Sequence, residues 1–405
     1  MTFPLPIDDS LRRRLPPGTG VLLGISGGVD SAVALALLRE LGCDVQCVTF
    51  KNFCYSADQV DLTDKSCCSL EAIEDARRLA RRFDAPHWVG DVEAPFRQAV
   101  IDPFIAEYTR ARTPNPCLDC NGSVRFPELM RLADRQGCRF AATGHYARVA
   151  GDATGARLLR GLDPGKDQSY FLHRIAPEFF ERMVFPLGDY VKPDVRAAAR
   201  ALGLDVAEKR DSQEICFVPD GDRSFLFAAD DIADRRALAA GPIVDRAGVV
   251  VGEHRGLIHY TVGQRKGLGV AAPEPLYVLE LDIDRQRLVV GPRRELETFA
   301  VVASDFRPAV PDFPDRWTAG DPEPARPPEA GAGPIVARIR HRHPGAAVAA
   351  WACVDGGIEV TLSEPVDGAA PGQGLVLYAG DMVLGGGRLE GSRRTGAGAT
   401  DGMVR

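Results

Sequence analysis

The sequence predicts an α/β domain built on a parallel sheet, followed by two small β-rich domains. From about residue 19 to residue 150, short apolar strands alternate with helical stretches, which is the pattern of a parallel sheet covered by helices. After Phe217 the pattern changes to short apolar runs separated by glycines, which is typical of small β domains. A chain of 405 residues also exceeds one typical domain. We predict domains at 1–217, 218–296 and 297–384, and a disordered tail at 385–405.

The elements of the first domain follow from apolar runs and helix-ending residues. Strands are predicted at Val21–Ile25, Val45–Thr49, His87–Val92 and Arg139–Thr143. Helices are predicted at Ala32–Leu41, Leu70–Phe83, part of Val124–Gln136 and Val191–Leu202. A further helical stretch, Arg97–Arg110, contains Pro103 and is expected to be broken there, because proline lacks the backbone N–H that a helix needs.

The two C-terminal domains are predicted from alternating apolar residues. Their strands are expected at Gly241–Asp245, Gly248–Gly252, Leu276–Leu281, Arg287–Val290, Ile335–Ile339, Val348–Cys353, Ile358–Leu362 and Leu375–Tyr378. The proline-rich segment Pro308–Pro334 is predicted to be a long exposed loop. Gly385–Arg405 is rich in Gly, Arg and Ser, and this composition predicts the disordered tail.

Composition indicates an ordinary soluble protein, with 45% hydrophobic and 26% charged residues. No apolar run approaches the ~18 residues of a membrane span, and Met1–Pro17 lacks the apolar core of a signal peptide. We therefore expect a cytoplasmic protein. The net charge of −7 counts mildly against a nucleic-acid partner, although a local basic patch can act within an acidic protein. Ten cysteines without an export signal favour metal or catalytic thiols over disulfides.

The run Ser26-Gly27-Gly28-Val29-Asp30-Ser31 lies between a predicted strand and a predicted helix. Such a turn directs free backbone N–H groups and the positive helix end at an anion. The two glycines allow phosphate to approach, the serines add hydroxyl donors, and Asp30 is a candidate Mg²⁺ ligand. The run lacks both the Gly-Lys-Ser/Thr ending of the Walker loop and the dinucleotide Gly-x-Gly-x-x-Gly pattern. It resembles the loop of ATP pyrophosphatases, which split ATP between its α and β phosphates.

Two cysteine-containing segments indicate thiol chemistry in addition to phosphate binding. Thr113–Asn121 contains Cys117 and Cys120 in Cys-x-x-Cys spacing, on a segment stiffened by two prolines. This spacing lowers thiol pKa in redox proteins and also suits metal ligation. Cys216 follows the polar lead-in Asp211–Glu214, which favours a role in a site over that of a small buried hydrophobe.

Two polar segments are further candidate parts of a functional site. His145, in Ala142–Arg148, follows a predicted strand and so lies on the ligand side of the sheet. Gly165–Tyr170 is a polar turn with one cation, Lys166. Taken alone, either segment is compatible with an ordinary structural histidine or a solvated loop.

Together these five segments resemble the bacterial tRNA-specific 2-thiouridylases, closely over about 19–300 and more loosely after that. His254–Gly256 and Tyr260–Gly269 look like that family's central domain, and Pro371–Gln373 with Leu375–Tyr378 looks like its C-terminal β-barrel. The resemblance implies an adenine nucleotide alpha hydrolase-like fold for the first domain. It also implies that the enzyme replaces the 2-oxygen of the wobble uridine, position 34, with sulfur, in a reaction that consumes ATP and requires Mg²⁺.

The resemblance also implies roles for single residues. Cys216 would carry the sulfur as a persulfide, and Cys120 would assist as acid/base or resolve it, leaving a Cys120–Cys216 disulfide. A cysteine desulfurase or a sulfur-relay protein would supply the sulfur. The implied ATP contacts are Gly24, Ile25, Ser26, Gly27, Gly28, Val29, Asp30, Ser31, Phe50 and Gly144. The implied tRNA contacts are Asn115, Pro116 and Cys117 beside the flipped base, and His145, Lys166, Asp167, Gln168, Arg340, His341 and Gln373.

Several alternatives stay open at the level of sequence. Many relatives have Asp where this chain has Cys117, so that Cys117, Cys120 and Cys216 form a candidate ligand set for a 4Fe–4S cluster in the same reaction. Cys54, Cys67 and Cys68 are read as incidental or regulatory thiols. Another tRNA-modifying or amidating ATP pyrophosphatase, a nucleotide-binding redox sensor and an RNA-binding module are the competing functions.

Overall fold

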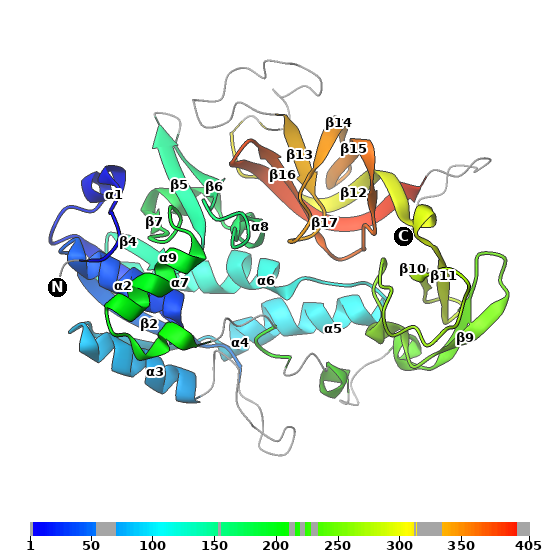
Figure 1. Cartoon of the computed structure of the whole chain (residues 1–405), viewed down its shortest axis with the longest axis horizontal. Helices are drawn as coiled ribbons and strands as arrows, with labels where there is room; N and C mark the ends of the chain where they lie inside the picture. Colours follow the sequence, from blue (N-terminus) through cyan, green and yellow to red (C-terminus); the bar gives the residue numbers. More distant parts are fainter. Residues whose placement is uncertain are drawn as a thin grey trace. The chain divides into compact units, whose positions relative to one another are not determined.

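A computed structural model describes residues 3–53, 70–152, 155–209, 215–218, 223–227, 234–311, 313 and 334–394 (Figure 1). The chain divides into two compact units, which are described separately below. The first unit contains residues 1–100 and 117–225, and the second contains residues 101–116 and 226–405. Residues 101–116 therefore belong with the C-terminal region, although they are inserted within the N-terminal domain in sequence.

The first unit is built on a five-stranded parallel sheet, which confirms the predicted fold class. The strand order is β3-β2-β1-β4-β7, and all four neighbouring pairs are parallel. The bounds are β1 Gly20–Gly24, β2 Asp44–Lys51, β3 His87–Asp91, β4 Phe140–Thr143 and β7 Met183–Val184. An antiparallel hairpin of β5 (Ala147–Asp152) and β6 (Gly155–Arg160), which the sequence did not predict, follows β4.

Helices follow the strands as the sequence predicts. Their bounds are α1 Asp9–Arg14, α2 Val29–Glu40, α3 Leu70–Arg82, α4 Glu93–Phe96, α5 Asp102–Thr109, α6 Pro116–Asp119, α7 Phe126–Arg135, α8 Ser169–Leu172 and α9 Lys192–Ala201. The π-helices η1 (Arg97–Ile101) and η2 (Cys120–Arg125) and the 3₁₀ turns η3 (Pro177–Arg182) and η4 (Asp205–Glu208) connect them. The expected break near Pro103 is present, because η1 interrupts the helix and Pro103 lies in the first turn of α5.

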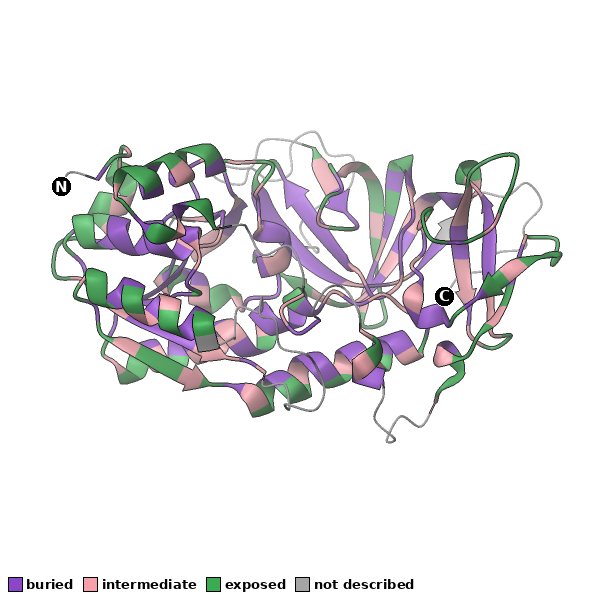
Figure 2. Ribbon diagram, turned by 60° about the horizontal axis from the view of Figure 1, so that its bottom comes forward, coloured by how far each residue is buried: buried purple, intermediate pink, exposed green. Residues whose placement is uncertain are grey.

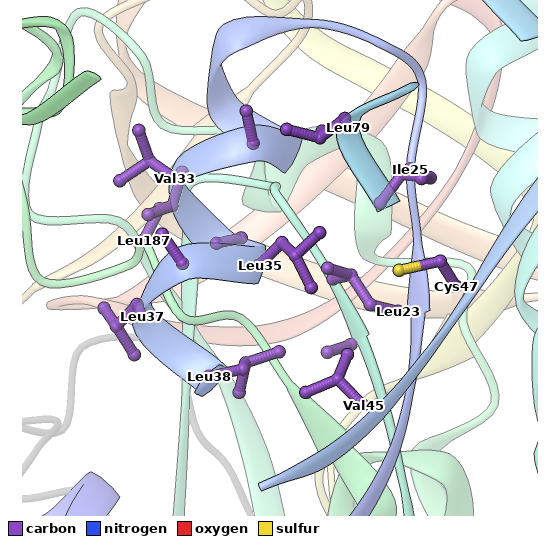
Figure 3. Close-up of a cluster of buried hydrophobic side chains, with 14 of the residues drawn as sticks. Leu23, Ile25, Val33, Leu35, Leu37, Leu38, Val45, Cys47, Leu79 and Leu187 are labelled. Atoms are coloured by element: carbon purple, nitrogen blue, oxygen red, sulfur yellow. The ribbon is translucent and has the colours of Figure 1, made fainter. Parts of the chain in front are cut away.

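One apolar core joins the sheet to α2, α3 and α9 (Figure 3). Alternate residues of β1, Val21 and Leu23, point into this core, while Leu22 points to the other face. Leu35 and Leu38 of α2 are fully buried in it. Figure 2 shows the general alternation of buried and exposed residues along the helices and strands. Burial of large aliphatic side chains contributes roughly 1.5–3 kcal/mol each, and this holds α2 firmly against the sheet.

The strand order reverses next to β1, whose two neighbours are β2 on one side and β4 on the other. Gly24, at the end of β1, pairs with Thr143, at the end of β4. In open α/β sheets, ligands bind outside the carboxyl ends of the strands at such a reversal. The Ser26–Ser31 turn and the Gly144–His145 segment leave the sheet at this point.

The second unit contains a four-stranded sheet of order β10-β11-β8-β9. Its strands are β8 Gly241–Val244, β9 Val250–His254, β10 Leu276–Asp282 and β11 Arg287–Pro292. Short 3₁₀ turns flank them at η6 (Ser224–Phe227), η7 (Arg236–Leu238), η8 (Leu257–His259) and η9 (Arg293–Leu296). This sheet confirms the small β-rich domain expected from the central glycine-separated runs.

Six antiparallel strands then close into a barrel of order β12-β15-β14-β13-β16-β17, with β12 paired to β17. The bounds are β12 Glu297–Pro308, β13 Ile335–Arg338, β14 Ala346–Val354, β15 Gly357–Asp367, β16 Gly374–Ala379 and β17 Met382–Arg394. The predicted C-terminal barrel is confirmed, but β12 and β17 were not predicted.

The prediction of a disordered tail from Gly385 is wrong as far as Arg394, because these residues form most of β17. The glycines serve close strand contacts here. A Cβ on Gly385 would lie 2.6 Å from the carbonyl oxygen of Arg307, and one on Gly387 would lie 2.6 Å from that of Ser304. Sequence composition cannot distinguish glycine required for close approach from glycine in a flexible tail.

Three sequence predictions fall on parts of the chain outside the described residues. These are the segment with Cys54, Cys67 and Cys68, nearly all of the proline-rich loop, and the end of the tail from residue 395. Within the described part of the chain, no helix has the length and apolar character needed to cross a membrane.

Candidate active site

The Ser26–Ser31 turn joins β1 to α2 and presents the N-terminus of α2, as predicted. Gly27 has a φ of +68°, and a Cβ there would lie 2.9 Å from the carbonyl oxygen of Ala72, so only glycine fits. The hydroxyl of Ser31 donates to the carbonyl oxygen of Gly28 at 3.0 Å and accepts from the N–H of Ser26 at 3.4 Å. These bonds fold the turn into a fixed cradle at the positive end of a 12-residue helix.

Asp30 is held by two side chains that arrive from later in the chain. Both carboxylate oxygens of Asp30 lie 2.7 Å from Nζ of Lys192. The hydroxyl of Tyr146 donates to Oδ1 of Asp30 at 2.7 Å. The carboxylate read from the sequence as a Mg²⁺ ligand thus binds an ammonium group in this structure.

The other implied ATP contacts differ in how they lie relative to the loop. Gly144 lies against the loop, since a Cβ there would come within 3.0 Å of the backbone of Asp30 and Ser31. Ile25 and Val29 bury their side chains in the core, so that only their backbone groups can face a nucleotide. Phe50, on β2, covers Gly90 of β3, where a Cβ would lie 2.9 Å from the ring.

The Cys-x-x-Cys segment forms α6 and then the π-helix η2. Cys117 is exposed, while Cys120 is buried. The side-chain amide of Asn121 donates to the carbonyl oxygen of Phe171 at 3.0 Å. Gly122 packs so tightly on the next segment that a Cβ would lie 2.8 Å from Cβ of Arg174. The backbone carrying Cys120 is therefore fixed by contacts with residues 171–174.

Cys216 lies in a short turn closed by a hydrogen bond from the N–H of Val218 to the carbonyl oxygen of Ile215, 2.9 Å. It is half-buried, and its neighbour Phe217 packs edge-on against Phe96 of α4, with ring centroids 5.6 Å apart. Helix α4 itself contacts η2, which begins at Cys120. The segments that carry the two predicted catalytic thiols therefore both contact α4. Neither Cys120 nor Cys216 forms a disulfide in this structure.

Three other cysteines are parts of the core. Burial raises the pKa of Cys43 to about 11, that of Cys47 to about 12 and that of Cys138 to about 11. These thiols stay protonated at neutral pH and cannot act as nucleophiles.

Within the described residues, no three His, Cys, Asp or Glu side chains are grouped so that they could hold a metal ion. Cys117, Cys120 and Cys216 all lie in the described part of the chain, so they do not form the ligand set that a 4Fe–4S cluster needs. The residues present do not fit the cluster.

His145 follows β4, as predicted, in an aromatic environment. Its ring lies 5.8 Å from that of Phe126 and 6.3 Å from that of Phe185. Its Nδ1 and the hydroxyl of Thr143 are 2.7 Å apart. Burial, with a smaller repulsion from Arg125, lowers the pKa of His145 to about 3, so the ring is neutral near pH 7.

In the Lys166–Gln168 turn, Lys166 lies at the surface and Asp167 is buried. Lys166 lines an open cleft of about 590 Å³ together with Lys192, Arg196 and Arg200. The carboxylate of Asp167 is buried and accepts from the N–H groups of Gly161 and Ser169, at 3.1 and 3.0 Å. The side chain of Gln168 accepts from the N–H of Tyr146 at 2.9 Å. Lys166 faces the cleft, whereas Asp167 and Gln168 shape the turn.

The three implied tRNA contacts in the C-terminal barrel lie at its loops. Arg340 is exposed and donates to the carbonyl oxygen of Asp367 at 3.1 Å. The carbonyl oxygen of His341 accepts from Arg338 at 2.7 Å. The side-chain amide of Gln373 donates to the carbonyl oxygen of Thr113 at 2.8 Å, which ties the barrel to the segment before the cysteines.

Sequence reasoning missed two lysines that lie against the phosphate loop. Lys192 contacts Asp30, and Nζ of Lys209 lies 3.4 Å from the carbonyl oxygen of Gly27. The sequence did indicate that a basic residue from elsewhere in the chain is needed here. A phosphate loop that contains Asp30 and no basic residue needs a cation from elsewhere.

Comparison with known proteins decides the family. The "tRNA methyl transferase HUP domain" model matches residues 19–220, the "tRNA methyl transferase PRC-barrel domain" model residues 230–292, and the "Aminomethyltransferase beta-barrel domain" model residues 316–389. The tRNA-specific 2-thiouridylase MnmA of Geobacter metallireducens is 42% identical over 93% of this chain and 98% of its own length. This chain belongs to the tRNA-specific 2-thiouridylases.

Other 2-thiouridylases are similarly close over their full length. That of Methylorubrum extorquens is 43% identical over 94% of this chain and 95% of its own. That of Moorella thermoacetica is 42% identical over 91% of this chain and 99% of its own. Among solved structures, NMN synthetase from Francisella tularensis covers 50% of this chain and 73% of its own with a TM-score of 0.32, a likeness too weak to support an argument.

Proposed function

We propose that this protein replaces the 2-oxygen of the wobble uridine of tRNA, position 34, with sulfur in an ATP-dependent reaction. The observation that carries the proposal is the Ser26–Ser31 cradle at the point of strand reversal, in a chain whose full-length relatives are 2-thiouridylases. A carbonyl oxygen is a poor leaving group, and a loop for pyrophosphate is what its activation by ATP requires.

The proposed reaction has three steps. The uridine 2-oxygen attacks the α-phosphorus of ATP, and the bond to the β-phosphate breaks with its electron pair leaving on pyrophosphate. The terminal sulfur of a Cys216 persulfide then attacks C2, and AMP departs with the original oxygen. Finally the thiolate of Cys120 attacks the Cys216 sulfur, which frees 2-thiouridine and leaves a Cys120–Cys216 disulfide for a thiol reductant to reduce.

The environment of the two thiols supports these assignments. Cys120 is only 6% exposed and sits on a backbone fixed by Asn121 and Gly122. Cys216 is more accessible, as a sulfur carrier must be in order to accept sulfur from a cysteine desulfurase or a relay protein. Cys117 is exposed, and we place Asn115, Pro116 and Cys117 beside the flipped base.

We propose a division of labour among the domains. Residues 1–217 bind ATP and carry the chemistry, while 218–296 and 297–384 bind tRNA. Lys166 supplies a phosphate contact from the first domain, and Arg340 and His341 supply contacts from the barrel. Asp167, Gln168 and Gln373 act by holding the segments to which their hydrogen bonds run. Mg²⁺ enters as the counter-ion of the ATP phosphates, and the reaction takes place in the cytoplasm.

The test is thiolation of unmodified tRNA by iron-free protein that is given ATP, Mg²⁺, a persulfide donor and a thiol reductant. We expect 2-thiouridine by nucleoside mass spectrometry, and a loss of at least 100-fold in Cys216→Ser and Cys120→Ser. Cys353→Ser is the matched control, because Cys353 is an exposed thiol on β14 of the barrel. Full activity in Cys216→Ser would remove it as the sulfur carrier. ATP binding without tRNA-dependent pyrophosphate release would favour a nucleotide-binding redox sensor.

A further inference from the structure

The phosphate loop carries no positive charge of its own. Within Ser26–Ser31 the only ionisable side chain is the carboxylate of Asp30. The N-terminus of α2 offers the equivalent of roughly half a positive charge. A triphosphate, and still more the pyrophosphate that leaves it, carries several negative charges. Any protein cation that joins Mg²⁺ in neutralising these phosphates must therefore come from another part of the chain.

Lys192 is the first such cation. It is the first residue of α9, and its side chain is only 8% exposed. Its Nζ lies 2.7 Å from both carboxylate oxygens of Asp30, in the first turn of α2. It also lies 5.7 Å from the centre of the Tyr146 ring, whose hydroxyl holds the same carboxylate. The ammonium is thus aimed at the start of the phosphate-binding helix.

Lys209 is the second cation and approaches the glycine end of the same loop. Its Nζ lies 3.4 Å from the carbonyl oxygen of Gly27 and 2.9 Å from a carboxylate oxygen of Asp75. Asp75 is itself pressed against Gly27, since a Cβ on this glycine would lie 2.9 Å from Cβ of Asp75. Each lysine therefore has a carboxylate partner, and both stand at the loop.

We propose that Lys192 and Lys209 are the cationic ligands of the β and γ phosphates of ATP and of the departing pyrophosphate, and that Asp30 and Asp75 hold them in place until ATP binds. This inference rests on the proposed function. The lysine ammonium is a compact charge on a flexible stem, so it can move from carboxylate to phosphate without backbone movement. When the α–β bond breaks, negative charge grows on the β-phosphate, and cations already at that position stabilise it.

A solely structural ion pair would have a different consequence. If Lys192 only neutralised Asp30, removing both charges together would leave nucleotide binding intact. If Lys192 binds phosphate, the double variant loses ATP affinity although no charge is left unpaired. Asp30→Asn alone keeps the lysine, and its amide oxygen can still accept a hydrogen bond.

The experiment measures binding of ATP, pyrophosphate and AMP, with Mg²⁺, by calorimetry on the full chain. We expect Lys192→Met, Lys209→Met and the double variant Asp30→Asn/Lys192→Met to bind ATP and pyrophosphate roughly 10- to 100-fold more weakly, the range for one charged hydrogen bond. AMP binding should change less than threefold in each. Asp30→Asn alone keeps Lys192, so it should weaken ATP and pyrophosphate binding less than the double variant Asp30→Asn/Lys192→Met does.

Arg200→Met is the matched control, because it removes a positive charge from the same helix, and its guanidinium pairs with Glu208 instead. ATP affinity that is retained in Lys209→Met and in the double variant, or reduced as much in Arg200→Met, would overturn the assignment. Equal losses for AMP and ATP would also overturn it. If the unaltered protein binds no ATP at all, the proposed function itself fails, and the assignment fails with it.

Discussion

Gln373 and Thr113 are joined by a hydrogen bond of 2.8 Å from the side-chain amide of Gln373 to the backbone carbonyl of Thr113. The N–H of Thr113 in turn donates to the carbonyl oxygen of Pro371 at 2.8 Å. A Cβ on Gly372 would lie 2.9 Å from the backbone of Thr113. Within the second compact unit, the barrel turn 371–373 thus fixes the position of Thr113, four residues before Cys117, by two hydrogen bonds and close packing.

Because the Gln373–Thr113 hydrogen bond positions the segment before Cys117, we predict that Gln373→Leu lowers the kcat of tRNA thiolation by roughly 3- to 10-fold, the value of one neutral hydrogen bond. The Kd for tRNA should stay within twofold. Filter binding and single-turnover thiolation separate the two quantities. Leu362→Met, on the buried side of β15, tests for nonspecific effects of barrel substitution. A weaker Kd with unchanged kcat would instead make Gln373 a direct tRNA contact.

Arg112 anchors the same segment more strongly. It donates to Glu390 at 2.6 Å and to Glu107 at 2.8 Å. We predict that Arg112→Met lowers the free energy of unfolding of this unit by at least about 1.5–3 kcal/mol, because its charged hydrogen bonds to Glu107 and Glu390 are both lost. Arg307→Met, which removes an exposed pair with Asp305 on the same barrel, should cost less than about 1 kcal/mol. Urea unfolding followed by tryptophan fluorescence measures both, and equal effects would contradict the argument.

The fold was predictable where local pattern and burial agree. Strands β1 to β4 and helices α2, α3, α7 and α9 were expected within a few residues of their bounds, because apolar residues of the right period mark them, whereas the two-residue strand β7 was not predicted. β12 escaped prediction because its partners β15 and β17 are distant in sequence, whereas β17 pairs with the adjacent β16 as well as with β12. In β17, glycines that permit close strand contact were read as a sign of disorder.

The site was predictable only where its residues are contiguous. Ser26–Ser31 folds as expected because a strand, two glycines and a helix suffice to define it. Lys192 and Lys209 lie more than 160 residues further along, and no local pattern in their own segments points to a phosphate. Asp167 was expected to contact tRNA, but its burial and its two backbone hydrogen bonds depend on the folded turn.

The partly buried histidine after β4, His145, predicts a specific response to acid. Burial lowers the pKa of His145 from 6.5 to about 3, so the folded state favours the neutral ring. This contribution is fully present above pH 6.5 and is lost as the pH falls toward 3, because the unfolded chain then binds a proton that the folded chain excludes. We predict that His145→Gln reduces the fall in urea midpoint between pH 7.5 and pH 5. His341→Gln is the matched histidine control, and an unchanged fall in His145→Gln would contradict the burial argument.

The two adjacent glycines of the phosphate loop provide the sharpest comparison, since the structure gives them opposite requirements. Gly27 has a φ of +68° and would place a Cβ 2.9 Å from backbone and side-chain atoms of α3. Gly28 has a φ of −97° and would place a Cβ no closer than 3.4 Å to Ser26 Oγ. We therefore predict that Gly27→Ala destabilises the protein by at least about 1–2 kcal/mol, the cost of a side chain in left-handed backbone, and abolishes ATP binding. Gly28→Ala should leave the melting temperature within about 2 °C, since it adds no strain. Thermal unfolding of both variants decides the matter, because equal losses of stability would mean that the loop does not hold the conformation described.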